Sequence, residues 1–241
     1  GVNLTMEDGD FITVIGGNGA GKSTLMNAIA GAWPIDEGTI LIDGANVTHL
    51  PEHKRAAFIG RVFQDPMMGT AATMGIEENL ALAKRRGKLR TLMPGIKKAE
   101  RDEYRELLKT LGLGLEDRLT SKVGLLSGGQ RQALTLLMAT LIKPKLLLLD
   151  EHTAALDPKT AAKVLNATDR IVSKDHLTTL MITHNMRDAI AHGNRLIMMH
   201  DGRIILDIRG DEKQKLTVED LMHEFEKISG EAFASDKALL G

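Results

Sequence analysis

The sequence predicts an α/β fold in which a core of strands and helices is interrupted by a helical insert. Apolar strand-like segments alternate with a helix-like segment up to Phe63, and a second alternating block follows from Lys145 onward. Between Asp65 and Gly128 the pattern is that of helices. Alternation at both ends with a helical interruption is typical of an α/β core that carries a helical subdomain.

The first block opens with Val2, Leu4 and Met6, which alternate with polar residues and predict an antiparallel strand. A turn then leads into a continuous apolar segment, which predicts a buried strand. A helix follows this strand and ends at Gly31. The elements predicted in this block after the turn are a strand at Phe11–Ile15, a helix at Lys22–Ala30, and strands at Thr39–Ile42 and Ile59–Phe63.

The insert and the second block complete the predicted architecture. The insert should hold helices at about Ile76–Arg85, at about Lys97–Leu111, and from the SGGQ stretch onward. The second block should hold strands at Lys145–Leu149 and Leu177–Thr183, helices at Pro158–Ser173 and Met186–Ala191, and a hairpin of Arg195–Met199 with Arg203–Asp207 through Asp201-Gly202. Thr217 and Asp220 predict the cap of a last helix, whose apolar stripe is Leu221, Phe225 and Ile228. We therefore expect a core of residues 1–65 and 138–241 and a helical subdomain of residues 66–137.

The composition argues against several classes of protein. Lys plus Arg (31) nearly balances Asp plus Glu (32), which gives no overall attraction to nucleic acid or anionic lipid. The sequence has no cysteine, which excludes disulfides and thiolate metal sites and fits a reducing cytosol. Five Phe, one Trp and one Tyr supply few rings for stacking on bases, so nucleic acid is not an expected partner. The longest uncharged apolar stretch, Ala133–Ile142, is far shorter than the roughly 20 residues of a spanning helix.

A phosphate-binding loop is predicted directly after the first buried strand. The segment matches G-x-x-x-x-G-K-[ST], with a strand before it and a helix after it. Backbone N–H groups of such a loop, with the positive end of the helix dipole, bind phosphates. Lys22 is expected to reach the β- and γ-phosphates of ATP, and the Ser23 hydroxyl to bind Mg²⁺. A glycine-rich turn without function is the alternative, which the context disfavours. The predicted ATP-binding residues are Gly16, Gly17, Asn18, Gly19, Ala20, Gly21, Lys22, Ser23 and Thr24.

Two acidic residues end the apolar strand of the second block. Asp150 and Glu151 follow four consecutive leucines. Beside a phosphate loop, Asp150 would belong to the Mg²⁺ shell, and Glu151 would polarise the water that attacks the γ-phosphate. The alternative is a solvated acidic pair at a strand end, which the phosphate loop upstream disfavours.

The stretch Leu126-Ser127-Gly128-Gly129-Gln130, about 20 residues before these acids, resembles the signature of ATP-binding-cassette (ABC) ATPases. The resemblance covers essentially the whole chain. It implies a P-loop NTPase (RecA-like) core with an antiparallel β subdomain and an inserted α-helical signature subdomain. It also implies Mg²⁺ and ATP as cofactors and a head-to-tail dimer with ATP between the protomers. Implied site residues are Lys22, Gln64, Glu151 and His184 for catalysis, Ser23, Gln64 and Asp150 for the metal, and Ser127, Gly128, Gly129, Gln130 and Asp157 for the ATP of the opposite protomer.

Two features depart from the family pattern. His152 stands where a proline normally follows the catalytic glutamate. We expect this substitution to be tolerated, although a second imidazole near the γ-phosphate could tune the pH dependence of hydrolysis. The family also carries an aromatic residue on an N-terminal strand that stacks on adenine, and nothing before Phe11 can serve. We expect the first strand and that residue to precede Gly1 in the natural protein.

A single cassette of this kind resembles ATPase subunits of bacterial transporters, most often importers. The resemblance implies a separate membrane permease, an indirect partnership with a solute-binding protein, and a cytoplasmic position on the inner face of the membrane. The implied docking groove lies around Asp65–Ala72 and Ile76–Ala83 and includes Met67 and Met68, which could equally be core residues. The basic stretch Lys84–Arg90 is either a solvated loop or a contact for anionic lipid.

The tail from Leu216 to Leu240 resembles bacterial ATPases grouped with importers of branched-chain amino acid type, so amino acids or similar small solutes are the expected cargo. The main alternative is a soluble ABC ATPase of DNA repair or translation, although neither a long coiled-coil insertion nor a second cassette is present. A nucleotide sensor without turnover is a third class, against which Glu151 argues.

Overall fold

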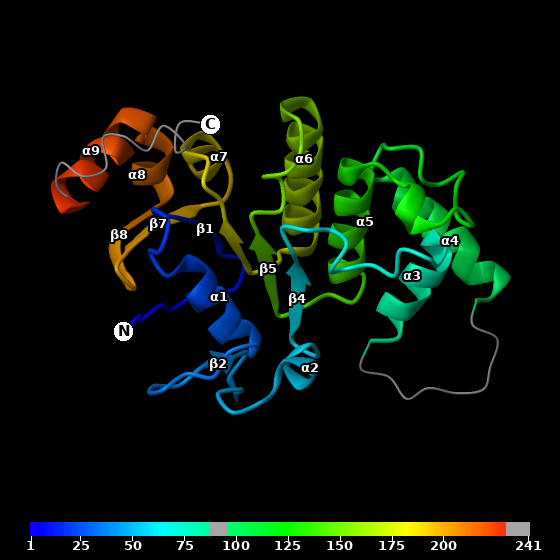
Figure 1. Cartoon of the computed structure of the whole chain (residues 1–241), viewed down its shortest axis with the longest axis horizontal. Coiled ribbons are helices and arrows are strands. Elements are labelled where there is room, and N and C mark those ends of the chain that lie inside the picture. Colours follow the sequence, from blue (N-terminus) through cyan, green and yellow to red (C-terminus); the bar gives the residue numbers. More distant parts are fainter. Residues whose placement is uncertain (87–95, 230–241) are drawn as a thin grey trace.

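The computed structural model describes residues 1–86 and 96–229 of the chain. Its main sheet has six strands in the order β4-β5-β6-β1-β7-β8 (Figure 1). The first five run parallel and β8 is antiparallel to β7. These strands are β4 (Ile59–Val62), β5 (Leu146–Asp150), β6 (Thr179–Ile182), β1 (Phe11–Ile15), β7 (Arg195–His200) and β8 (Arg203–Arg209). The predicted α/β class is confirmed.

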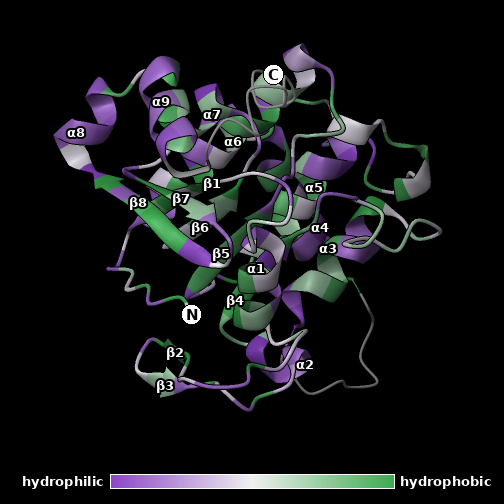
Figure 2. Cartoon of the chain, turned by 60° about the vertical axis from the view of Figure 1, so that its left-hand side comes forward, coloured by the Kyte–Doolittle hydropathy of each residue, from purple (hydrophilic) through white to green (hydrophobic). Residues whose placement is uncertain are grey.

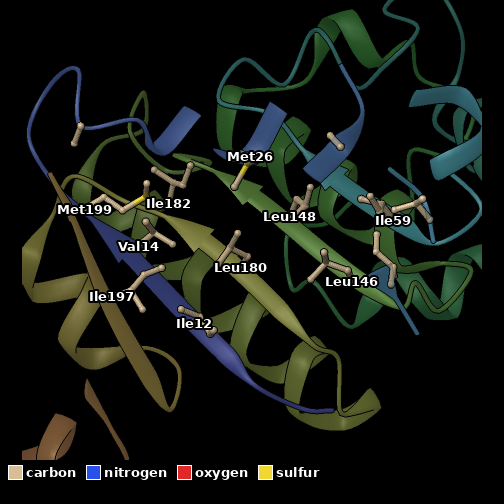
Figure 3. Close-up of a cluster of buried hydrophobic side chains, with 14 residues drawn as sticks. Ile12, Val14, Met26, Ile59, Leu146, Leu148, Leu180, Ile182, Ile197 and Met199 are labelled. Atoms are coloured by element: carbon tan, nitrogen blue, oxygen red, sulfur yellow. The ribbon is translucent and has the colours of Figure 1, made fainter. Parts of the chain in front are cut away.

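Both faces of the parallel strands are buried, as their continuous apolar sequences require. Alternate residues of a strand point to opposite faces. In β5, Leu146 and Leu148 therefore face α1 (Lys22–Ala30), while Leu147 and Leu149 face α5 (Gly128–Thr140) and α6 (Pro158–Asp175). Figure 3 shows the first of these clusters, which includes Ile12, Val14, Met26, Ile59, Leu146, Leu148, Leu180, Ile182, Ile197 and Met199.

A third cluster lies where the C-terminal helices cover the sheet. It joins α7 (Met186–Ala191) and α9 (Val218–Ser229) to Ile15, Leu196 and Met198. The predicted stripe residues Leu221 and Phe225 are buried in it, whereas the Ile228 side chain lies outside the described part of the structure. The predicted cap is also found, because Asp220 N donates to Thr217 Oγ1 at 3.1 Å and Thr217 N donates to Asp220 Oδ2 at 2.9 Å. A short helix that was not predicted, α8 (Gly210–Lys215), precedes this cap.

The insert forms a core of its own. Its helices α3 (Ile76–Lys84) and α4 (Lys98–Lys109) pack with α5 around buried residues such as Tyr104 and Leu108. A 3₁₀ turn at Val123–Leu125 leads into α5. Because α5 places Leu134 and Leu137 in this core and Leu136 and Ala139 in the core of the sheet, it joins the two units.

The antiparallel β part is small. It consists of β2 (Leu41–Ile42) and β3 (Ala45–Asn46), which lie apart from the main sheet near α2 (Glu52–Arg55) (Figure 2). The strand predicted at Val2, Leu4 and Met6 is wrong, because residues 1–6 pair with none of the strands found in the described parts of the chain. Their alternation instead reflects partial burial of these three side chains against the core of the sheet.

The buried Arg55 side chain attaches α2 to the end of α1. Its guanidinium donates to the carbonyls of Ala28 and Ile29 at 2.7 and 2.8 Å, and to those of Leu50 and Thr48 at 2.8 Å each. The last carbonyls of a helix lack partners within the helix. Arg55 therefore caps α1 although it lies 27 and 26 residues beyond the two helix residues that it contacts.

The basic stretch of the insert is partly neutralised. Lys84 pairs with Glu103, and Arg85 donates to Glu100 at 3.0 Å. Arg86 donates to the Ile142 carbonyl at 3.4 Å, and Lys88 and Arg90 fall within residues 87–95, which lie outside the described residues. Across residues 1–86 and 96–229, no helix combines the length and apolar character needed to cross a membrane.

Candidate functional site

The phosphate loop follows β1 and requires glycine at two close contacts. Gly16 has a φ of 151°, and a Cβ there would lie 2.3 Å from the Met199 carbonyl oxygen. Gly21 has a φ of 96° and faces Gly202 in the turn between β7 and β8. The Gly202 N–H also donates to the Ala20 carbonyl at 3.0 Å. The predicted hairpin through Asp201-Gly202 therefore packs directly against the phosphate loop, and only glycine fits at the two loop positions that contact it.

The Lys22 side chain lies folded along this loop. Its Nζ donates to the Gly16 carbonyl at 2.7 Å and to the Gly17 carbonyl at 3.1 Å. Burial lowers the pKa of Lys22, and the charges of Glu151 and Asp150 oppose that shift. The ammonium thus lies within electrostatic reach of both carboxylates. Asn18, Gly19, Ser23 and Thr24 are exposed and free to meet a ligand.

The two predicted carboxylates lie at the end of β5, next to the end of β6. Asp150 pairs with Ile182 across the ladder, so Glu151 and His184 lie one and two residues beyond the paired ends. The Glu151 N–H still donates to the Ile182 carbonyl at 3.1 Å. His184 Nδ1 lies 3.6 Å from Glu151 Oε2. The strand register therefore brings these two predicted catalytic side chains together.

Glu151 occupies a conformation that is unusual for a residue with a Cβ. Its φ is 43°, in the left-handed region. Such conformations cost about 1–3 kcal/mol and persist where surrounding contacts hold them, commonly at functional sites. The Ala154 N–H donates to the Glu151 carbonyl at 3.0 Å and closes the turn. The turn directs the chain from β5 toward α6.

Gln64 lies just beyond the end of β4 and is exposed. The Gln132 side chain on α5 donates to the carbonyl of the preceding residue, Phe63, at 2.9 Å. The helix that begins at the signature is therefore bonded directly to the segment that carries Gln64. No signal in the sequence identified Gln132 as this link.

The signature residues open α5 as predicted. Ser127 Oγ accepts from Gln130 N at 3.3 Å, and Gln130 Oε1 accepts from Ser127 N at 3.1 Å. Gly129 packs against α6, where an added Cβ would lie 2.0 Å from Thr160 Cγ2. Asp157 begins α6 by accepting from Thr160 N at 3.1 Å. In the part of the chain that the structure describes, no hydrogen bond or ion pair joins residues 127–130 to residues 16–24.

His152 does not lie where the sequence suggested. Its ring is buried, with 2% of the residue exposed, and Nε2 lies 3.1 Å from Thr168 Oγ1 on α6. Burial lowers the pKa of His152 to about 4, and the charge of His192 acts in the same direction. The alternative of a second imidazole near the γ-phosphate is therefore wrong. Because the chain turns sharply at Glu151, the next side chain enters the core instead of the site.

The oxygen donors of the site fit magnesium. Ser23 offers a hydroxyl, Gln64 an amide and Asp150 a carboxylate, which are the kinds of ligand that Mg²⁺ prefers. Asp150 Oδ2 lies 3.4 Å from Arg61 Nη2, and its other oxygen has no protein donor among the described residues. Within residues 1–86 and 96–229, no group of three or more His, Asp or Glu side chains is placed to hold a metal.

Comparisons with known proteins agree with this geometry. A family model described as ABC transporter matches residues 1–154. The chain is 47% identical over 225 residues to a tyrosine transport ATP-binding protein of Clostridioides difficile, covering 93% of this chain and 89% of that protein. It is 37% identical over 209 residues to a methionine import ATP-binding protein of Rhizobium johnstonii, covering 85% of this chain and 55% of that protein. It is 33% identical over 207 residues to a spermidine/putrescine import ATP-binding protein of Pasteurella multocida, covering 85% of this chain and 52% of that protein. The chain thus spans about half the length of these last two relatives.

Solved structures give the same result. An ATP-binding cassette determined as a dimer in a post-hydrolysis state with ADP and Pi is similar with a TM-score of 0.73 and 31% identity, covering 86% of this chain and 88% of that one. A nucleotide-free cassette of an ABC transporter is similar with a TM-score of 0.75 and 28% identity, covering 92% and 88%. The chain therefore belongs to the ABC transporter family, as one of its ATP-hydrolysing cassettes with the P-loop NTPase fold.

Proposed function

We propose that this chain is the ATP-binding and ATP-hydrolysing subunit of a bacterial importer for amino acids or similar small solutes. One observation carries the hydrolytic part. Glu151 and His184 lie 3.6 Å apart, and the Lys22 ammonium lies within the field of Glu151 and Asp150. A phosphate-binding cation, a carboxylate base and an imidazole are thus gathered beyond the carboxyl ends of neighbouring parallel strands, where ligands bind in α/β sheets.

Each of these groups has a role in the proposed reaction. The loop N–H groups and the start of α1 bind the phosphates, and Lys22 exchanges its carbonyl partners for β- and γ-phosphate oxygens. Glu151 accepts a proton from the attacking water, while His184 orients that carboxylate and contacts the γ-phosphate. Ser23, Gln64 and Asp150 would hold Mg²⁺, which supplies charge neutralisation of the phosphates when bound.

A second copy of the chain would complete the site. Ser127, Gly128, Gly129 and Gln130, with Asp157, would contact the ATP of the opposite protomer in a head-to-tail dimer. Two observations support this arrangement. No hydrogen bond within the described residues joins the signature to the phosphate loop of the same chain, and a similar cassette was solved as a dimer. The exposed N-terminus of α5 would present N–H groups and its dipole to a phosphate.

The transport assignment is supported by the relatives, whose names refer to tyrosine transport and to methionine import. Exposed apolar side chains also support a membrane partner. Met67, Met68, Leu82 and Leu125 are 44%, 70%, 52% and 72% exposed. We assign these side chains to contact with a permease and the subunit to the cytoplasmic face of the membrane. A solute-binding protein would act through that permease. The soluble repair or translation role is disfavoured, since the relatives named above are transport proteins.

A carboxamide at the proposed base tests the hydrolytic mechanism. Glu151→Gln keeps the size of the side chain but cannot accept the proton, so hydrolysis should nearly stop while ATP still binds. Retained ATP should hold two chains together because each nucleotide contacts both. Gel filtration with Mg·ATP and with Mg·ADP measures this, and the variant should be dimeric only with Mg·ATP. Hydrolysis at the wild-type rate would remove Glu151 from the catalytic role.

Reconstitution tests the transport role separately. The wild-type chain should join its candidate permease in detergent and then in liposomes. A solute-binding protein loaded with tyrosine or another amino acid should raise its ATPase rate above that with the empty binding protein. An ATPase that hydrolyses ATP but neither binds the permease nor responds to the loaded protein would support the soluble alternative.

A further inference from the structure

Arg61 lies in the middle of β4 on the face that packs against α1, although it is charged and its neighbours in the strand are apolar. Its side chain is 12% exposed. Arginine keeps its charge in proteins, and a charge removed from water costs several kcal/mol unless it is paired. The contacts of this guanidinium therefore need a specific arrangement, and they involve four neighbours.

The first contacts reach α1 and β5. Nη2 donates to Asn27 Oδ1 at 2.7 Å and lies 3.4 Å from Asp150 Oδ2. Asn27 is four residues after Ser23 on α1, about one helical turn away. The guanidinium thus bridges the helix that carries Ser23 and the strand that ends in Asp150.

The remaining contacts reach the segment after β4 and α2. The guanidinium carbon lies 4.6 Å from the centre of the Phe63 ring, a cation–π contact, and Phe63 directly precedes Gln64. Nη1 forms a longer ion pair with Glu52 at 3.8 Å, and Nε has no partner among the described residues. One side chain therefore contacts the element of each of the three proposed magnesium ligands.

We propose that Arg61 is a positioning residue for the magnesium site, where it fixes α1, Asp150 and the Gln64 segment relative to one another. This inference rests on the proposed function, which supplies the ligand set of Ser23, Gln64 and Asp150. By holding Asp150 Oδ2, Arg61 leaves the other carboxylate oxygen for the ion. Partners of ligating carboxylates commonly influence metal affinity in this way.

Charge and position make opposite predictions for removing Arg61. A cation next to Asp150 repels a second cation, so loss of its charge alone would strengthen Mg²⁺ binding. Loss of the contacts to Asn27, Asp150 and Phe63 would weaken Mg²⁺ binding because the ligands would no longer be held in place. The direction in which Mg²⁺ affinity changes therefore tells the two effects apart. Arg61→Lys is a second test, because it keeps the charge but lacks the planar group that makes these contacts.

The experiment measures ADP affinity in excess Mg²⁺ and in EDTA, by calorimetry, for wild type, Arg61→Met, Arg61→Lys and Arg170→Met. The ratio of the two affinities reports the contribution of magnesium. We expect this ratio to fall about tenfold or more in both Arg61 variants, with the affinity in EDTA unchanged. Arg170 is exposed on α6, and its variant is the control for loss of one positive charge. The ratio of ADP affinities in Arg170→Met should equal that of wild type.

Several outcomes would overturn the proposal. The first is a ratio of ADP affinities in Mg²⁺ and in EDTA that rises or stays constant in Arg61→Met. The second is a ratio in Arg61→Lys that equals that of wild type. If Arg61→Met does not fold, as thermal unfolding without nucleotide would show, Asn27→Ala takes its place, because it removes the 2.7 Å contact and keeps the charge. Its ratio should also fall, and an unchanged ratio there refutes the inference. A wild-type affinity for ADP that is independent of Mg²⁺ contradicts the metal ligands of the proposed function itself.

Discussion

Acidification should destabilise this protein through His152. The Thr168 hydroxyl donates to the Val164 carbonyl at 3.0 Å, so it can only accept from His152 Nε2 at 3.1 Å. Nε2 of His152 therefore carries a proton, and the low pKa of the ring keeps it neutral near pH 7. Burial is the main cause that lowers the pKa of His152 from 6.5 to about 4, helped by the charge of His192 and opposed by that of Asp169. Protonation of the folded protein would place an unpaired charge in the core.

The sign and size of the effect follow from these two pKa values. Below pH 6.5 the unfolded chain takes up a proton at His152 that the folded chain refuses until about pH 4. Stability is therefore lost as the pH falls through this window. The linkage relation gives a loss of about 2 kcal/mol between pH 7 and pH 5, and about 3 kcal/mol once both states are protonated. For a domain of this size, 2 kcal/mol lowers Tm by roughly 4–8 °C.

Urea unfolding at pH 7 and pH 5 measures the loss, with wild type compared to His152→Gln. The glutamine amide can still donate to Thr168 but does not titrate. We expect the decrease in unfolding free energy between the two pH values to be smaller by about 2 kcal/mol in the variant. His53→Gln, at an exposed position on α2, is the matched control and should keep the wild-type pH dependence. If wild type and His152→Gln lose the same stability, the buried neutral imidazole is not the cause.

Two further substitutions test packing. Gly129→Ala should lower the free energy of unfolding by about 1–3 kcal/mol, because the new Cβ meets Thr160 Cγ2 at 2.0 Å. Adding Thr160→Ser removes that methyl group, so the double variant should regain most of the lost stability in urea unfolding. If it does not, the destabilisation has another origin. Arg55→Met should lower the free energy of unfolding by at least about 1–3 kcal/mol, because it removes four hydrogen bonds and leaves the Ile29 carbonyl at the end of α1 without a partner. A loss below about 1 kcal/mol would show that water satisfies this carbonyl.

The strands and motifs that could be predicted are those whose structure is decided by residues next to them in the sequence. β1 and α1 have the predicted bounds, and β5 and β6 lie within one or two residues of the predicted ones. Each is a continuous apolar run or a helix stopped by glycine, so the sequence next to it decides the structure. The meeting of Glu151 and His184 was likewise predictable, because parallel neighbouring strands bring their ends to the same edge of the sheet.

The residues that could not be predicted act through contacts between distant parts of the chain. Arg61 meets Asn27 and Asp150, which lie 34 and 89 residues away in sequence. Only the presence of a charge inside an apolar strand could have marked it. Similarly, β3 has two residues, too few for a periodic pattern, and β2 forms only the last two residues of the strand predicted at Thr39–Ile42. The direction of the His152 side chain depends on the left-handed φ of Glu151, for which a non-glycine residue gives no signal.

The two halves of the proposed composite site are held by different parts of the fold. Glu151 and His184 are fixed by the sheet, because the Glu151 N–H continues the bonding between β5 and β6 at 3.1 Å. The signature lies at the start of α5, which packs into both cores and bonds through Gln132 to the Phe63 carbonyl. A rotation of the helical unit would therefore move the signature and the segment before Gln64 together, while the Glu151–His184 pair stays in place. We accordingly expect a permease that contacts Met67, Met68, Leu82 and Leu125 to change assembly of the composite site more than the geometry of the catalytic pair.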